Sequence, residues 1–213
     1  MKLVKFFTFF FFVSFVSLAQ QKITVDEIFT GAFRTKRMDE LQSMKNSNQY
    51  TVLNMDRASR SMTIDLYDFS TLKKASTLLS TLDHKELQGI DSYTFSNDEK
   101  QILIATNSAP IFRHSFTADY YLYDVAGKKL SKVLEAVQEP TFSPDGKRIA
   151  FAKGNNLFIL DVASNTTFQI TTDGKKNSII NGITDWVYEE EFAFVKAFDW
   201  SSDGSKIAYI RFD

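Results

Sequence analysis

Three consecutive glutamates, Glu189, Glu190 and Glu191, follow Trp186 and Tyr188 in the segment ITDWVYEEEF. Adjacent carboxylates repel one another by on the order of 1 kcal/mol even in water, and by more where water is partly excluded. Such a cluster is tolerated where it is fully solvated or where it receives a cation. A primary ammonium group has three donors and would relieve the repulsion between two of the carboxylates. The residue types therefore indicate either an acidic surface or an ammonium-binding site.

A short helix is expected to carry these glutamates. Thr184 or Asp185 can act as its N-cap, and the following WVYEEEFAFVKAF suits the helix itself. The helix dipole stabilises carboxylates near the N-terminus, typically by about 0.3–1 kcal/mol. Because consecutive helical residues are rotated by about 100°, at most two neighbouring carboxylates can share one ligand. The simpler interpretation is a capped surface helix with a solvated acidic face, on which Trp186 and Tyr188 are packing residues.

The residue types needed for several other chemistries are scarce. The chain has no cysteine, and its two histidines, His84 and His114, are isolated in the sequence. Disulfides, thiolate ligands and a histidine cluster for zinc are excluded, and we expect neither a metal nor another cofactor. His114 has no nucleophile as a partner and is interpreted as a structural or loop residue. Lys and Arg number 25 against 26 for Asp and Glu, with no basic block, so a nucleic-acid partner is not expected.

An internal repeat indicates which elements position the glutamates. Three segments align without gaps as an aromatic residue, a serine, a polar turn and an apolar strand: TFSNDEKQILIAT (94–106), TFSPDGKRIAFAK (141–153) and DWSSDGSKIAYIR (199–211). In two of them an Asp-Gly pair supplies the turn, since glycine tolerates positive φ and aspartate can bond its own backbone. The residues after the turn suit a pleated, half-buried strand. The repeat predicts an all-β fold made of strand-turn-strand units.

The spacing of the repeat selects one all-β architecture. The equivalent aromatic residues Phe95, Phe142 and Trp200 are separated by 142 − 95 = 47 and 200 − 142 = 58 residues, and Tyr50 lies 95 − 50 = 45 residues before Phe95. A period of about 40–50 residues with four strands per unit is typical of a β-propeller blade. We expect a partial β-propeller of about three and a half blades, which looks truncated. The extra 58 − 47 = 11 residues fall across 177–198, so the glutamates belong to an insertion within a blade.

The N-terminus has the pattern of a targeting segment. Two lysines precede a long apolar run that ends at Ala19. Residues 1–19 are therefore interpreted as a signal peptide, although an uncleaved membrane anchor has the same pattern. We expect an exported protein, periplasmic or secreted, with a lead-in segment at 20–45 and the propeller at 46–213.

Three stretches resemble one known family: NGITDWVYEEEF (181–192), FRHSFTADYYLYD (112–124) and ITVDEIFTG (23–31). They are similar to the propeller domain of dipeptidyl peptidase IV-like serine peptidases, in the prolyl oligopeptidase clan. The resemblance covers 22–213, and the DWVYEEE string is its most specific part. In that family an eight-bladed propeller caps an α/β-hydrolase domain, and the two domains together remove N-terminal dipeptides, preferably with proline second.

The resemblance also implies roles for individual residues. It implies that Glu190 and Glu191 bind the free α-amino group of the substrate and that Arg113 contacts a backbone carbonyl of the same N-terminal segment. An always-charged guanidinium could orient that carbonyl and partly offset the acidic field. Without the resemblance, the simpler interpretation of Arg113 is a structural salt bridge to a blade loop.

The resemblance places catalysis in a C-terminal α/β-hydrolase domain that this chain does not reach. No Gly-x-Ser-x-Gly sequence is present, so no catalytic residue is assigned and the chain alone is expected to be inactive. The expected partners are a peptide with a free N-terminus and the hydrolase domain. The resemblance is also compatible with a homodimer. Two alternatives remain. One is a prolyl tripeptidyl peptidase, in which the loops set a longer distance between the bound amino group and the peptide bond that is cut. The other is a non-catalytic propeller scaffold that binds peptides or proteins.

Overall fold

The computed structural model describes residues 23–35 and 40–213, and the chain divides into two units, Met1–Met38 and Asp39–Asp213. The signal peptide predicted at 1–19 lies outside the described residues. Within the described ranges, no helix is long and apolar enough to cross a membrane.

The described residues of the first unit contain one short helix, α1 (Val25–Thr30). The helix begins with a capping box, in which Glu27 N donates to Thr24 Oγ1 (3.2 Å) and Thr24 N donates to Glu27 Oε2 (2.9 Å). Gly31 ends it in the left-handed conformation, with φ of 82°. These local signals explain why a helix of only six residues forms in this lead-in segment.

The second unit opens with a four-stranded antiparallel meander. Its strands are β1 (Leu41–Ser43), β2 (Gln49–Asp56), β3 (Ser61–Asp68) and β4 (Lys74–Ser80), in that order across the sheet. The buried carboxylate of Asp65 accepts hydrogen bonds from Asn54 Nδ2 (2.9 Å) and Thr77 Oγ1 (2.7 Å) and pairs with Lys74 Nζ (2.8 Å). One polar group thus links three neighbouring strands of this blade.

A seven-stranded sheet follows and contains two blades. Its strands are β5 (Ser92–Phe95), β6 (Gln101–Pro110), β7 (Phe116–Asp124), β8 (Lys129–Phe142), β9 (Arg148–Lys153), β10 (Asn156–Asp161) and β11 (Thr166–Gln169). The first part of β8 pairs with β7 and its last part pairs with β9. Left-handed residues Ala136 (φ 49°) and Glu139 (φ 52°) lie where the pairing changes. Strand β8 is therefore the last strand of one blade and the first strand of the next.

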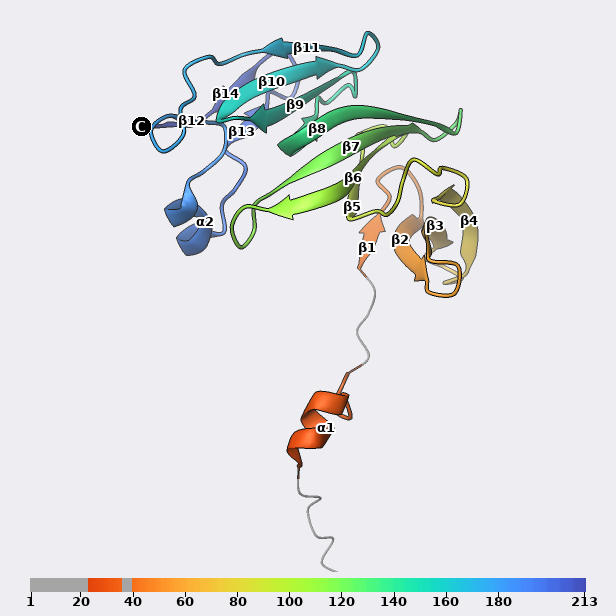
Figure 1. The fold of residues 1–213 in the computed structure, drawn as a ribbon. Helices are drawn as coiled ribbons and strands as arrows, with labels where there is room; N and C mark the ends of the chain where they lie inside the picture. The colour runs from red at the N-terminus through yellow and green to blue at the C-terminus, as the bar shows by residue number, and fades with distance from the viewer. Residues whose placement is uncertain (1–22, 36–39) are drawn as a thin grey trace, which may run out of the picture. The chain divides into compact units, whose positions relative to one another are not determined.

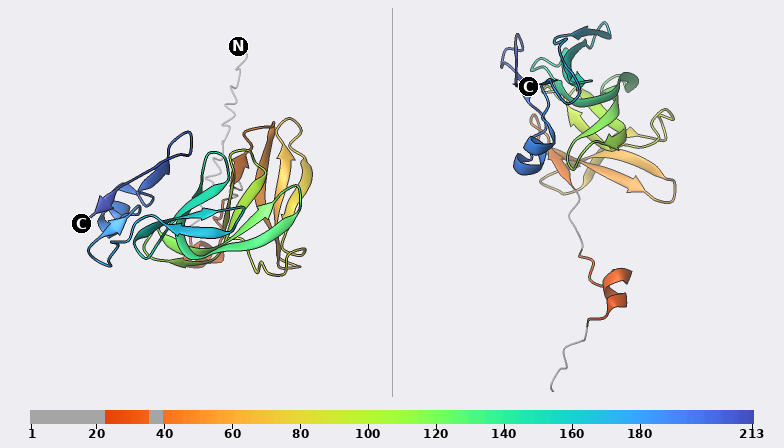
Figure 2. Two further views of the ribbon diagram at one scale, coloured as in Figure 1. Left: turned by 90° about the horizontal axis from the view of Figure 1, so that it is seen from above. Right: turned by 60° about the vertical axis from the view of Figure 1, so that its left-hand side comes forward.

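The C-terminal part holds half a blade and a helical insertion. Its elements are β12 (Ile180–Asn181), α2 (Trp186–Phe192), β13 (Phe198–Trp200), β14 (Ile207–Tyr209) and β15 (Arg211–Phe212). Strand β13 pairs with β14, and β12 pairs with β15. Figures 1 and 2 show these elements following the two blades that share β8. The predicted all-β partial propeller of about three and a half blades, with a short helical insertion, is confirmed.

The second strands of the two blades in the seven-stranded sheet, β6 and β9, are buried on both faces. In β6, Ile102 and Ile104 belong to a core cluster with residues of the first sheet, while Leu103 and Ala105 belong to a cluster with residues of β9 and β10. Strand β9 repeats this division, with alternate side chains in two different clusters. Each core therefore lies between two neighbouring blades. This explains why QILIAT and RIAFA are continuous apolar runs, as expected for strands covered on both sides.

The predicted strand-turn-strand units are present, and each turn is held by its own serine and aspartate. In the turn between β8 and β9, Ser143 Oγ donates to Asp145 Oδ1 (2.7 Å) and accepts from Arg148 N (3.0 Å). Ser96 and Ser201 make the equivalent pair of bonds in the turns after β5 and β13. These contacts span only five residues, so the local sequence is sufficient to specify them.

The predicted position of Tyr50 in the repeat is wrong. Tyr50 lies in β2, the second strand of its blade, whereas Phe95 ends β5, a first strand. The hydrogen bond from Met44 N to Gln49 O corresponds to the hydrogen bond from Ser96 N to Gln101 O. Met44 is therefore equivalent to Ser96, and Ser43 is equivalent to Phe95, at a spacing of 95 − 43 = 52 residues. Strand β1 has neither an aromatic residue nor an Asp-Gly turn, so sequence comparison missed it. The boundary predicted at residue 46 falls in the turn between β1 and β2.

Candidate functional site

The insertion that carries the three glutamates begins as the sequence predicts. Asp185 is the N-cap of α2, and its Oδ1 accepts a hydrogen bond from Tyr188 N (3.1 Å). The helix ends earlier than expected, because Ala193 adopts the left-handed conformation (φ 50°) and its N–H donates to Glu189 O. The rest of the predicted helix is not helical: Lys196 forms a β-bridge with Ile183, and Phe198 begins β13.

Both ends of the insertion are fastened to each other and to the blade. Thr184 N donates to Val195 O (3.1 Å), and Ala197 N donates to Gly182 O (2.9 Å). Gly182 has φ of 76°, and a Cβ atom there would lie 2.4 Å from Leu157 Cδ2. Only glycine suits this position, because it combines a left-handed backbone with a close approach to the neighbouring blade. These backbone contacts at the two ends of the insertion, which we call its neck, fix the position at which α2 leaves the sheet.

Glu189 is buried, with 1% of its surface exposed. Its Oε1 accepts two backbone hydrogen bonds, from His114 N (2.6 Å) and Ser115 N (2.9 Å), at the tip of the β6–β7 hairpin. Burial alone raises the pKa of the Glu189 carboxyl, but the Ser115 side chain and the two backbone N–H groups lower it, and the net pKa lies below the ordinary value. The interpretation of a fully solvated acidic face is therefore wrong for this residue.

Glu190 and Arg113 lie together. Arg113 Nε is 3.1 Å from Glu190 Oε2, and the Glu190 side chain is 17% exposed while the Arg113 side chain is 71% exposed. The structure thus brings two of the three predicted site residues into direct contact. The same geometry also matches the simpler interpretation of Arg113 as a salt-bridge partner.

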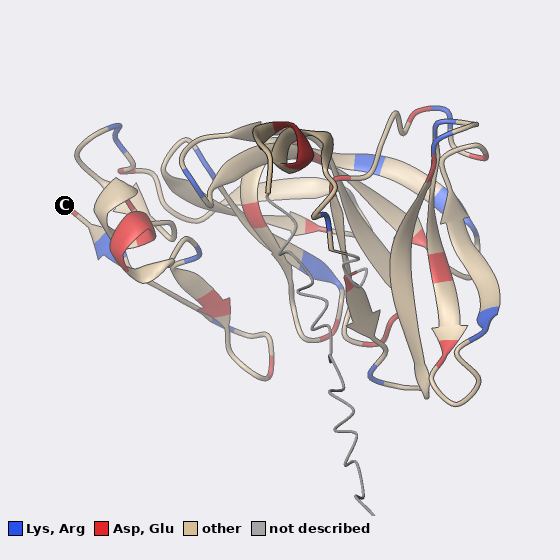
Figure 3. Cartoon of the chain, turned by 90° about the horizontal axis from the view of Figure 1, so that it is seen from below, with Lys and Arg blue, Asp and Glu red and all other residues tan. Residues whose placement is uncertain are grey.

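Glu191 is exposed, and its side chain makes no hydrogen bond or ion pair with the described residues. Figure 3 shows the acidic band that the glutamates form on α2, close to the C-terminus. Of the two expected packing residues, Tyr188 packs against Phe192 and Phe212, with ring centroids 5.8 Å and 4.9 Å away. Trp186 is 57% exposed, so its assignment as a packing residue is wrong.

The β6–β7 hairpin reaches α2 because its pairing is interrupted. Asn107 is left-handed (φ 55°) at a register shift between Thr106 and Ala109, and Ser108 N donates to Asp91 Oδ2 (2.8 Å). Such a bulge bends the hairpin. The tip then closes with a bond from Ile111 N to the carbonyl of Ser115 (2.9 Å), which places Arg113 opposite the helix. The sequence did not predict that the His114 and Ser115 N–H groups would bind Glu189, because every residue type except proline carries a backbone N–H group.

Two hollows flank the insertion and neither contains Glu190 or Glu191. One, of about 720 Å³, is lined by Ile111 and Phe112 of the hairpin tip, Trp186 and Val187 of α2, and Phe212. The other, of about 570 Å³, lies along the first strands of successive blades.

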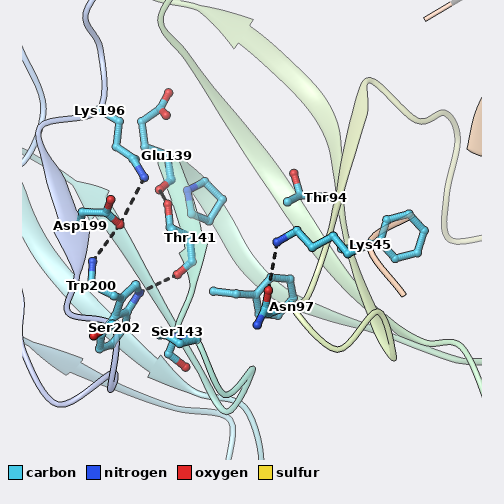
Figure 4. A pocket seen from close by; sticks show the side chains of 14 residues that line it. Lys45, Thr94, Asn97, Glu139, Thr141, Ser143, Lys196, Asp199, Trp200 and Ser202 are labelled. Atoms are coloured by element: carbon cyan, nitrogen blue, oxygen red, sulfur yellow. Dashed lines mark hydrogen bonds and ion pairs between the residues drawn. The ribbon is translucent and has the colours of Figure 1, made fainter. Parts of the chain in front are cut away.

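Figure 4 shows the second hollow, with Glu139 and Lys196 side by side on one wall and Lys45 beside Asn97 on the other. Burial raises the pKa of the Glu139 carboxyl; the positive charge of Lys196 opposes the rise and the negative charge of Glu189 adds to it. Within the described ranges, no group of three or more His, Cys, Asp or Glu side chains could hold a metal ion.

The fold and the site together define a β-propeller in which one blade carries a carboxylate-bearing helical insertion. The sequence model of the family described as "Dipeptidyl peptidase IV (DPP IV) N-terminal region" matches residues 96–213, more than half of the chain. The chain therefore belongs to the dipeptidyl peptidase IV N-terminal region family, and the resemblance seen in the sequence is confirmed.

Individual relatives agree with this assignment. The chain is 37% identical to dipeptidyl peptidase 4 of Felis catus over 63% of its own length and 18% of the relative, and 34% identical to prolyl endopeptidase FAP of Mus musculus over 70% and 20%. The crystal structure of Porphyromonas gingivalis dipeptidyl peptidase 4 is similar, with a TM-score of 0.80 and 35% identity over 90% of this chain and 28% of that one. The chain spans about a fifth of the length of these curated relatives.

Proposed function

We propose that this chain is the propeller portion of an exported serine exopeptidase that removes N-terminal dipeptides, preferably Xaa-Pro. Glu190 and Glu191 hold the α-ammonium group of the substrate, and Arg113 orients a backbone carbonyl near it. The observation that carries the proposal is that Arg113 pairs with one carboxylate oxygen of Glu190, while Glu191 beside it has no described partner. Membership of the dipeptidyl peptidase IV family supports the choice of ligand.

The charges of the site suit a primary ammonium group. Two carboxylates and one guanidinium leave one net negative charge, which a single ammonium neutralises. Glu190 is largely shielded from water, so its hydrogen bonds to a charged donor are stronger than those of a solvated carboxylate. An ammonium anchored here fixes the distance to the peptide bond that is cut, and a substrate without the amine leaves partly buried carboxylates unpaired.

The test uses the intact protein that contains this chain, with a chromogenic Gly-Pro substrate and the same substrate acetylated at its N-terminus. Glu190→Gln and Glu191→Gln should each lower kcat/KM for the free amine by about 10- to 150-fold, the value of one charge-assisted hydrogen bond. Glu135→Gln is the matched control, because Glu135 is an exposed glutamate outside the insertion. Unchanged kinetics in both site variants would contradict the proposal.

Product analysis separates the related activities. Mass spectrometry of a peptide with proline at position two should show dipeptide release; release of a tripeptide would identify a tripeptidyl peptidase. One relative is named a prolyl endopeptidase, so cleavage of an acetylated peptide after an internal proline is the outcome that would favour that activity instead. Amine-dependent binding without cleavage would favour a peptide-binding scaffold.

A further inference from the structure

We infer that Glu189 is the positioning residue of the proposed ammonium site: it anchors the hairpin tip that carries Arg113 onto α2. The inference rests on the proposed function, in which Arg113 and Glu190 contact the substrate. It gives the first glutamate of the motif a role different from that of its two neighbours.

Arg113 cannot be positioned by its own side chain. That side chain is 71% exposed, and its one ion pair in the described part of the chain is with Glu190. A long, mostly exposed side chain with a single partner keeps most of its rotamer freedom, so this one ion pair does not by itself fix the guanidinium. The location of the guanidinium must therefore be set by the backbone to which it is attached.

Glu189 fixes that backbone at the two residues that follow Arg113. A single oxygen, Oε1, accepts both the His114 and the Ser115 N–H groups at 2.6 and 2.9 Å. Among the described residues, every hydrogen bond or ion pair between the 111–115 tip and α2 involves Glu189 or Glu190. Removing the Glu189 carboxylate would leave Arg113 attached to α2 through its single ion pair with Glu190.

Helix geometry explains why three adjacent glutamates can do three different things. Successive residues are rotated by about 100°, so their carboxylates leave the helix in three directions. Glu189 is turned into the protein and meets backbone donors, Glu190 meets the guanidinium, and Glu191 is exposed. Because the charge of Glu189 is compensated by N–H groups, Arg113 stays available to Glu190 and to a substrate carbonyl.

The first experiment measures the anchoring directly and needs no activity. Hydrogen exchange of the intact protein should show protected His114 and Ser115 amides in the wild type and at least 10-fold faster exchange in Glu189→Ala. Glu189→Gln keeps an oxygen at the same reach and should retain most of the protection. Equal protection in wild type and Glu189→Ala would overturn the inference.

The second experiment asks whether the anchoring acts through Arg113. Glu189→Ala and Arg113→Ala should each lower kcat/KM on the free-amine substrate by at least 10-fold, and the double variant should lose little more than either single variant. Glu189→Gln should recover part of the Glu189→Ala loss. Additive losses would show a merely structural role and overturn the inference.

The two proposals fail in different ways. If Arg113→Ala and Glu190→Gln both leave the kinetics unchanged, the proposed ammonium site is wrong, while hydrogen exchange still decides whether Glu189 anchors the tip. If Glu189→Ala does not fold, Glu189→Asp provides the comparison: it keeps the charge, but its shorter side chain reaches less far, so it should lose the protection that Glu189→Gln retains.

Discussion

The turn between β8 and β9 and the α2 insertion both use acidic side chains to hold backbone N–H groups, over very different distances in the sequence. In the turn, Asp145 Oδ1 accepts from Ser143 Oγ and from Lys147 N, two residues away on either side. In the insertion, Glu189 Oε1 accepts from residues 75 and 74 positions earlier in the chain. The turn is therefore built by local sequence, whereas the site forms only when the β6–β7 hairpin and the later α2 insertion are already packed together.

The largest effect is expected at the neck of the insertion. Gly182→Ala combines left-handed strain of about 1–2 kcal/mol with overpacking of about 1–3 kcal/mol against Leu157, so the free energy of unfolding should fall by about 3 kcal/mol. Gly154→Ala is the matched control, because Gly154 has φ of 57° but no atom within 4 Å of an added Cβ. Urea denaturation of the intact protein measures both; equal losses would show that the close approach to Leu157 is unimportant.

Loss of the long-range anchor should come next. Glu189→Ala leaves two backbone N–H groups without an acceptor, one of them on buried Ser115, at a cost of about 2 kcal/mol in the free energy of unfolding. Glu191→Ala, two residues further along the same helix, should change the free energy of unfolding by less than about 0.5 kcal/mol. Thermal denaturation of the two variants gives the comparison. Similar losses would mean that burial of Glu189 has no energetic consequence.

A smaller and uniform effect is expected in the repeated turns. Asp145→Ala and Asp98→Ala each remove an acceptor from a turn of the same design, and each should lower the free energy of unfolding by about 1 kcal/mol. The decisive measurement is hydrogen exchange in the α2 segment, which neither variant should alter. Faster exchange in α2 would break the distinction between local turns and the long-range site.

The smallest effect concerns pH and has opposite signs at two glutamates. The pKa of Glu189 is lowered, so its contribution to stability is present above its ordinary value of 4.5 and is lost as the pH falls through the folded-state pKa. The pKa of Glu139 is raised, so its contribution is present below 4.5 and is lost as the pH rises through the folded-state pKa. Glu139→Gln should therefore raise Tm at pH 7 but not at pH 4. A Tm gain that does not depend on pH would point to packing rather than to charge.

Prediction from sequence worked best where the contacts are short. The Ser-Asp turns, the Asp185 N-cap and the apolar strands all rest on residues within a few positions of one another, and the structure contains each of them. The register of the first blade was predicted wrongly, because β1 lacks the aromatic residue that precedes the turn in the other copies. The end of α2 was placed too late, since nothing in the residue types demands the left-handed conformation of Ala193.

The sequence by itself determined the blade repeat, the place of the insertion and the order of the three glutamates on one short helix. Only the tertiary structure decided that Glu189 is buried against the tip of a hairpin from another blade, that Glu190 meets Arg113, and that Glu191 is exposed. The physical reason lies in the partners. A turn is closed by side chains close by in the chain, whereas these carboxylates are distinguished by backbone N–H groups and a guanidinium that only the packing of successive blades brings within reach.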